Sequence, residues 1–218
     1  MIFDWGYAWD IAPRLAEGLV VTLQATVLGM AVALTLGLVL ALARRSHHRL
    51  LAWPTSALVE FVRSTPLLVQ IYFLFYILPD AGLRLSPLAT GVLALGLHYA
   101  AYCSEVYRAG LESVPKGQWE AAVALNLSHW RTMKDIIIPQ AIPPVVPALG
   151  NYLVAMFKDT PLLSAITVLE LLQAAKLVGS ETFRYVEPLT LVGVLFLILS
   201  LVSAAAIRWV EGRLRIEG

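Results

Sequence analysis

Residues 18–43 form a run of 26 residues without a single charged side chain. About 20 consecutive apolar residues in a helix are enough to cross the hydrocarbon core of a bilayer. The whole chain agrees, because 59% of its residues are hydrophobic and only 14% are charged. With a mean hydropathy of +0.74, it is too apolar to be covered as a soluble domain. We therefore expect an all-α integral membrane protein.

Four more apolar segments are long enough to be spans, at 54–78, 85–106, 136–157 and 188–207. Residues 160–172 are shorter and are bracketed by Asp159 and Glu170, so we expect a partial-depth helix covered by protein. The first 17 residues carry four charges, unlike a signal peptide. The predicted organisation is an extracytoplasmic tail (1–17), a transmembrane domain of five spans (18–210) and a cytoplasmic tail (211–218).

Basic side chains set the expected orientation. Ten of the 16 Lys and Arg residues fall on one side of a five-span topology, in the segments after spans one, three and five. By the positive-inside rule, this side is the cytoplasm. The N-terminus is then expected outside, with the C-terminus and the loop 109–135 inside. A net charge of +1 gives no polybasic face that would favour nucleic acid.

A polar stretch interrupts the apolar chain between the third and fourth spans. It reads EAAVALNLSHWRTMKDIIIP, from Glu120 to Pro139. We expect two short helices joined by a turn here. Between long apolar segments, such a unit presents a handle to a soluble partner.

Two further patterns concern helix packing. In the first span, small residues that let another helix approach closely recur every fourth position: Ala25, Gly29, Ala33, Gly37 and Ala41. That helix can belong to this chain or to another subunit. The fourth span holds Pro139, Pro143, Pro144 and Pro147, which predict a broken helix in the bundle interior, with Asn151 as a candidate path-lining residue. The lone Cys103 is expected to be a buried small side chain.

Charges inside predicted spans require partners, because one charge at a helix centre costs about 2.5–3.5 kcal/mol on the insertion scale. The pairs Glu60 with Arg63 and Glu105 with Arg108 are each three residues apart and share a helix face. We favour structural ion pairs for both and keep substrate contact as the alternative. The segment 158–160 joins the broken helix to the partial-depth one, so it is predicted to line a path or gate, or to act as a local hinge.

At this point the motifs resemble a family. They are Glu60-Phe61-Val62-Arg63-Ser64-Thr65-Pro66-Leu67-Leu68-Val69-Gln70, Glu105-Val106-Tyr107-Arg108, Pro115-Lys116-Gly117-Gln118-Trp119-Glu120-Ala121-Ala122, Ile138-Pro139-Gln140-Ala141 and Lys158-Asp159-Thr160-Pro161-Leu162-Leu163-Ser164. In this order and spacing, they resemble the permease subunit of a type I ABC importer, in the branch that carries polar amino acids such as histidine and glutamine. The resemblance covers about residues 18–210.

The resemblance implies that the loop around Glu120 is a coupling helix that docks on a separate ATPase subunit. Gly117 can open this helix, Glu120 in its first turn suits the helix dipole, and Ala121 and Ala122 are small enough for close docking. Asn126 stands where the family has Gly, and Asn is the next most permissive residue for positive φ. Pro139 completes the set of expected coupling residues.

The resemblance also implies the partners and the path. This chain has no phosphate-binding loop, because Lys116-Gly117 has the order of that motif reversed. ATP and Mg²⁺ are therefore expected on the ATPase subunit, and no catalytic or metal-binding residue is predicted here. A second permease chain, identical or homologous, and an extracytoplasmic solute-binding protein are expected in a bacterial inner membrane. The candidate path or gate residues are Thr65, Asn151, Lys158, Asp159 and Thr160.

Other classes of protein fit less well. An intramembrane enzyme would need catalytic groups at membrane depth, but His98 has no nucleophile at catalytic spacing. A secondary transporter or channel subunit would need no ATPase handle, and such transporters usually contain inverted repeats. The expected solute is a polar amino acid or a related zwitterion, and the opening residues 3–8 faintly resemble permeases for ectoine and hydroxyectoine.

Overall fold

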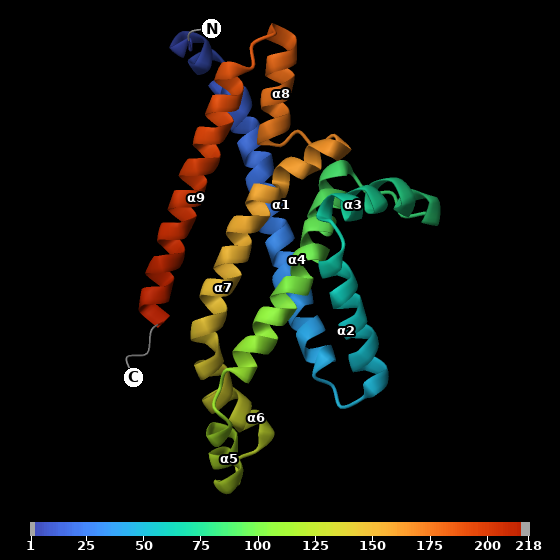
Figure 1. The fold of residues 1–218 in the computed structure, drawn as a ribbon, viewed down its shortest axis with the longest axis vertical. Coiled ribbons are helices and arrows are strands. Elements are labelled where there is room, and N and C mark those ends of the chain that lie inside the picture. The colour runs from blue at the N-terminus through green and yellow to red at the C-terminus, as the bar shows by residue number, and fades with distance from the viewer. Residues whose placement is uncertain (1–2, 215–218) are drawn as a thin grey trace.

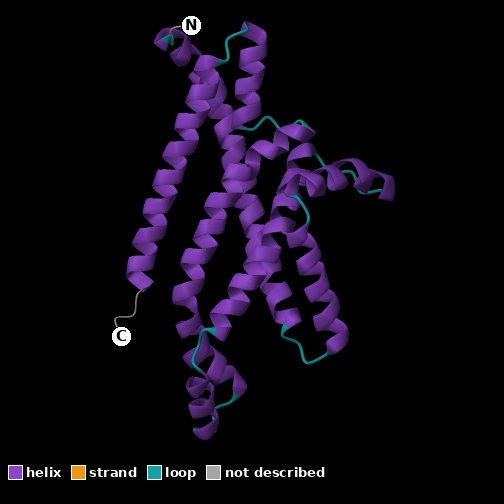
Figure 2. Cartoon of the chain, in the orientation of Figure 1, coloured by secondary structure: helices purple, strands orange, loops and turns teal. Residues whose placement is uncertain are grey.

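The computed structural model describes residues 3–214, which are helical in most positions and contain no strand. Helices α1, α4 and α9 run in one direction along the long axis of the molecule, and α2 and α7 run in the other (Figure 1). The start of α1 and the end of α9 therefore lie at opposite ends of the bundle. Short loops join the helices (Figure 2).

The helices have the following bounds, with short 3-10 and π segments marked η. In chain order they are α1 (Trp5–Arg44), α2 (Arg49–Ser64), α3 (Leu67–Tyr72), η1 (Phe73–Ile77), η2 (Leu78–Ala81), α4 (Pro87–Glu112), α5 (Lys116–Ala124), α6 (His129–Arg131), η3 (Thr132–Ile137), α7 (Ile138–Asp159), η4 (Thr160–Ile166), α8 (Leu171–Thr182) and α9 (Val186–Leu214).

Within the described residues, three helical stretches are long and apolar enough to cross a membrane: Trp5–Arg44, His129–Ile166 and Val186–Arg213. The bent pair of Arg49–Ser64 and Leu67–Ala81 makes a fourth if it is counted as one span. The predicted third span lies in α4, which has 26 residues and whose polar side chains lower its hydropathy. All five predicted spans thus fall in helical segments, and the second one is bent.

The most extensive contact between two helices of the described chain is between α1 and α4. All five small residues of the α1 stripe are buried. A Cβ added at Gly37 would lie 2.7 Å from the Cβ of Cys103, and one at Gly29 would lie 3.3 Å from the Cβ of Leu95. From the α4 side, Gly96 packs against Val32 in the same way. The stripe therefore serves packing within the chain, and Cys103 is buried as expected.

The predicted tail at 1–17 is not a tail. Residues 5–17 are the first turns of α1, and Asp4 caps this helix through the backbone N–H groups of Gly6 and Tyr7. Ion pairs tie these turns to the junction between α8 and α9: Arg14 with Glu181 at 2.6 Å and Arg184 with Asp4 at 3.4 Å. The sequence gives no sign of these pairs, because their partners lie far apart in the chain. Of the predicted tail at 211–218, residues 215–218 lie outside the described part.

The predicted break in the fourth span is also wrong. Helix α7 is continuous through Pro143, Pro144 and Pro147, and Pro139 stands at its start, where proline is favourable. Each internal proline removes one hydrogen bond, but its φ near −65° is compatible with a helix. The irregularity comes earlier, as the π-helix η3 that leads into α7.

The predicted partial-depth helix at 160–172 is two elements. A 3-10 helix, η4, ends at Ile166 and is followed by Thr167, which has a left-handed φ of 66°. The chain then continues to Glu170, which is fully buried and caps α8 through the N–H groups of Leu172 and Gln173. Asp159 is thus the last residue of α7 and Glu170 the cap of α8, and the two do not enclose a single short helix.

The α1–α4 contact predicts which glycine tolerates a methyl group. Gly37→Ala should lower the free energy of unfolding by about 1–3 kcal/mol, because the added Cβ overlaps Cys103 and the carbonyl oxygen of Ala100. Gly193→Ala is the control, since a Cβ there meets nothing within 4 Å. Thermal unfolding in detergent measures both, and an equal midpoint in the two variants would contradict the packing described here.

Candidate functional site

The polar loop forms a helical hairpin at one end of the molecule, on the side where α4 ends and α7 begins (Figure 1). Helix α5 ends in a turn at Asn126, whose φ is 50°. The N–H of Leu127 donates to the carbonyl oxygen of Ala122 at 3.0 Å and closes the turn. The two short helices and the positive φ at Asn126 are both as the sequence predicts.

The alanines of the hairpin differ in exposure. Ala122 is fully buried and so packs inside the chain, which corrects the expectation that it forms part of a docking surface. Trp119 of the same helix packs against a small core of Val114, Ile137 and Ala141. Ala121 is exposed, as are Gly117 and Pro139.

Glu120 is exposed but does not lie in the first turn. Helix α5 begins at Lys116 and has no acidic residue in its first turn, so the expected dipole interaction of Glu120 is absent. A Cβ at Gly117 would meet nothing within 4 Å, so no neighbour requires glycine at the second position of this helix.

Three apolar side chains of the hairpin point to solvent, and none of them belongs to the coupling residues expected from the sequence. Val123 is 78% exposed, Leu125 71% and Trp130 73%. They flank the Asn126 turn: Val123 lies on α5, Leu125 directly follows α5, and Trp130 lies on α6. The sequence carries a signal for them, because these large apolar residues lie in a polar stretch between two predicted spans. Together with Glu120 and Ala121 they form the tip surface of the hairpin.

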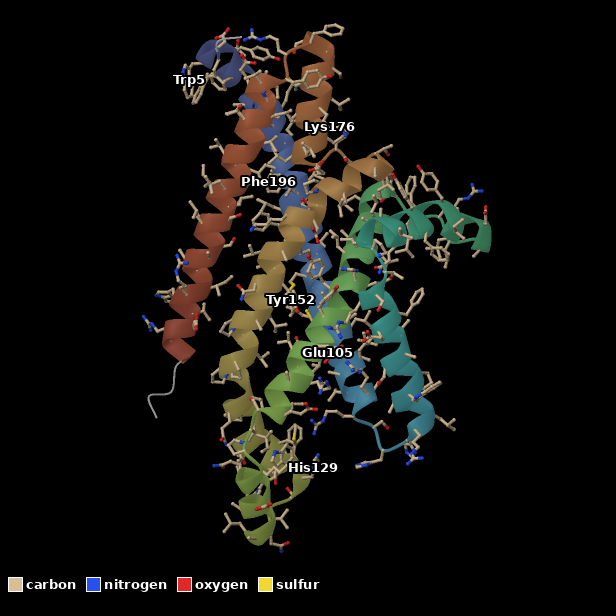
Figure 3. All side chains as sticks on the ribbon, in the orientation of Figure 1. Trp5, Glu105, His129, Tyr152, Lys176 and Phe196 are labelled. Carbon is tan, nitrogen blue, oxygen red and sulfur yellow. The ribbon has the colours of Figure 1, made fainter. Side chains whose placement is uncertain are left out.

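Further along α4, the two predicted ion pairs merge into one network. Glu105 accepts from Arg44 of α1 at 2.6 Å and from Arg108 at 2.8 Å. Arg63 of α2 lies 3.6 Å from Glu105 and 3.7 Å from Glu60. Glu105 lies among the helices, well away from the loop residue His129 (Figure 3). Arg44 could not be predicted as a partner of Glu105 from local spacing, because the two residues are far apart in the sequence.

A second polar cluster lies where α4 faces α7. The hydroxyl of Tyr99 donates to Asp159 at 2.6 Å. Tyr152 of α7, labelled in Figure 3, has its ring 5.5 Å from that of Tyr102 and 6.1 Å from that of Tyr99. The guanidinium of Arg63 lies 5.5 Å from the centre of the Tyr102 ring, which connects this tyrosine cluster to the Glu105 network.

The remaining candidate path residues do not come together. Thr160 is fully buried, and its hydroxyl donates to the carbonyl oxygen of Phe157, so it has a structural role at the end of α7. Asn151 and Lys158 are exposed. Thr65 lies at the end of α2 and is bonded to Gln70. Of the five, Asp159 accepts a hydrogen bond from a side chain of α4, and Thr65 is linked to His98 of α4 through Gln70.

The Glu105 network predicts unequal effects of two charge-removing substitutions. Glu105→Gln should destabilise the protein by about 2 kcal/mol, because Arg44 and Arg108 lose a charged acceptor whose side chain is only 20% exposed. Glu112→Gln removes one exposed pair with Arg108 and should cost under about 1 kcal/mol. Thermal unfolding in detergent compares the two, and equal losses would show that Glu105 does not hold the network together.

Comparisons with known proteins agree with this architecture. The family model described as "Binding-protein-dependent transport system inner membrane component" matches residues 33–216. A probable amino-acid ABC transporter permease protein, y4tG of Sinorhizobium fredii, is 48% identical and aligns with 98% of this chain and 97% of its own. The glutamine transport system permease protein GlnP of Escherichia coli K12 is 35% identical over 99% of this chain and all of its own.

The solved structures give the same result. One chain of an amino acid ABC transporter crystallised with histidines has a TM-score of 0.92 and 33% identity, covering 98% of this chain and 100% of its own. A chain of the MetNI methionine ABC transporter, at 19% identity and a TM-score of 0.75, shares the fold. The chain therefore belongs to the inner-membrane permease components of binding-protein-dependent transport systems, among the permease subunits of amino-acid ABC importers.

Proposed function

We propose that this permease takes its energy from a separate ATPase subunit, which binds the tip surface of the hairpin. The observation that carries the proposal is the exposure of Val123, Leu125 and Trp130 on a short rigid unit outside the bilayer. Large exposed apolar side chains around a helical turn fit a groove on a protein partner. ATP and Mg²⁺ belong to that partner.

The expected orientation fits this role. The hairpin and the C-terminal end of α9 are cytoplasmic, and the N-terminus is outside, in agreement with the distribution of basic residues. A solute-binding protein delivers its cargo to the opposite face, where α1 begins and α8 meets α9. A second permease chain completes the path. Helix α9 supports this, since only 6% of its apolar membrane-spanning stretch is buried within the chain. This leaves a long apolar face for lipid and a second subunit.

Transport then follows alternating access. Closure of the paired ATPases moves the two hairpins together, and the path changes from inward-facing to outward-facing. Hydrolysis resets it. Trp119 matters here because it packs α5 against the core of Val114, Ile137 and Ala141, so that a force on the tip surface moves the ends of α4 and α7 with it.

The tyrosine cluster with Asp159 is the best-supported part of the path. A carboxylate can neutralise the amino group of a zwitterionic solute, and tyrosine faces attract cations. Arg63, over the ring of Tyr102, offers a positive charge to a solute carboxylate. The proposed solute class is therefore polar amino acids and related zwitterions, and ectoine and hydroxyectoine stay within that class. Asn151, Lys158 and Thr65 remain weaker candidates.

A secondary transporter or channel subunit, the alternative that the sequence left open, does not fit the family to which the chain belongs. It would have no use for an exposed apolar hairpin tip, and it would purify without an ATPase. Co-purification with an ATPase subunit from the native membrane distinguishes the two functions directly.

The coupling proposal predicts the effect of a charge reversal in the tip surface. Glu120→Arg should abolish ATPase stimulation by the solute-binding protein while leaving membrane insertion intact, because Glu120 is exposed beside the docking residues. Asp80→Arg is the matched control, since Asp80 is exposed in η2, far from the hairpin (Figure 1). Normal stimulation in Glu120→Arg would refute the coupling role.

The path proposal predicts a loss of uptake without loss of assembly. Asp159→Asn keeps an acceptor for the Tyr99 hydroxyl but removes the charge, and uptake of the cognate solute into proteoliposomes should fall about tenfold, which corresponds to about 1.4 kcal/mol. A panel of amino acids and ectoines, tested with the cognate binding protein by ATPase stimulation, identifies that solute. Unchanged uptake in Asp159→Asn would remove this residue from the path.

A further inference from the structure

The second span contains a sharp bend that leaves backbone groups without helical partners. Helix α2 ends at Ser64, and the segment Leu67–Ala81, here called the arm, departs from it at an angle of 107°. The arm extends sideways from the bundle (Figure 1). Pro66 opens the arm and has no N–H. The carbonyl oxygen of Val62, four residues earlier, therefore has no backbone donor to complete the helix.

Two side chains replace the missing donors. The hydroxyl of Thr65 donates to the carbonyl oxygen of Phe61 at 3.0 Å. The Nε2 of Gln70, on the first turns of the arm, lies 2.8 Å from the carbonyl oxygen of Val62 and 2.7 Å from the hydroxyl oxygen of Thr65. One side-chain amide on the arm thus binds the last turn of α2 from across the bend.

A buried histidine orients this amide. The Oε1 of Gln70 lies 3.1 Å from Nδ1 of His98, and His98 of α4 is buried. Because the Nε2 of Gln70 faces oxygen acceptors, Oε1 must accept, and Nδ1 of His98 must carry the proton. The contact between Gln70 and His98 links the bend to α4.

The arm also packs against the segment that follows Asp159. Its buried residues Leu67 and Ile71 belong to the same core cluster as Leu163 and Ile166 of η4. If the arm changed direction, Leu67 and Ile71 would no longer pack against η4, and the neighbouring pair of Tyr99 and Asp159 would become more exposed.

We propose that Gln70 and His98 are positioning residues for transport: together they hold the second span in its bent form and so keep the arm over η4 and the Asp159 end of the path. Neither residue needs to contact the solute. The link to transport rests on the proposed function, but the bend itself can be measured without it.

The experiment measures the bend by electron spin resonance between spin labels at Leu58→Cys on α2 and Tyr76→Cys on the arm, both exposed. It uses the assembled importer in nanodiscs. His98→Leu and Gln70→Leu should broaden the distribution of distances between the two labels and reduce solute uptake about fivefold or more. The loss of one hydrogen bond changes the ratio of bent to unbent molecules by a factor of about five. His98→Asn, which offers a side-chain donor near the place of Nδ1, should restore both.

Tyr107→Phe is the matched control on the same helix. It removes a hydrogen bond from α4 to the carbonyl oxygen of Leu34 in α1 and should leave the distances unchanged. The proposal is overturned if the distances in Gln70→Leu and His98→Leu equal those of the unsubstituted importer, or if they change while uptake does not. Failure of the proposed function looks different, because the importer with native Gln70 and His98 would then show no ATPase stimulation at all.

Discussion

Close contact between α1 and α4 is the constraint on which the rest of this structure depends. It exists because small residues occupy one face of α1 and because Gly96 admits Val32 from the other side. Helix α4 then carries the groups that matter to the site: His98 toward the bend, Tyr99 toward Asp159 and Glu105 toward Arg44. With wider spacing between the two helices, Arg44 could not reach Glu105.

Several polar side chains within this apolar bundle are shared between helices in addition to being paired locally. Glu105 receives arginines from α1, α2 and its own helix. Gln70 joins three helical segments, and Tyr99 joins α4 to the end of α7. In a low-dielectric surrounding an unpaired polar group is costly, so each shared group also restricts how the helices can be arranged. The same groups that fix the bundle are those that a conformational change must rearrange.

Particular residues show what the sequence could and could not predict. The five apolar segments and the hairpin were predictable, because hydropathy and local turn chemistry are properties of short stretches, as Asn126 illustrates. The bend at Pro66 was visible in principle, since a proline in the middle of 54–78 removes a donor. Its consequence depends on Gln70 and His98, which no local pattern joins. The prolines of α7 misled in the opposite direction, because a proline signals a break only where nothing else supports the helix. The burial of Ala122 and the partner Arg44 depend on contacts distant in sequence.

Cys103 illustrates a practical consequence of the tight seam between α1 and α4. It is the only cysteine in the sequence, and it is fully buried with its Cβ directed at the space left by Gly37. A thiol sealed in this way is out of reach of maleimide and methanethiosulfonate reagents in the folded protein. The natural chain is therefore already suited to site-specific labelling: a cysteine introduced on the hairpin, on the arm or at the outer end of α8 becomes the one reactive thiol, and movements can be followed without altering the packing of the core.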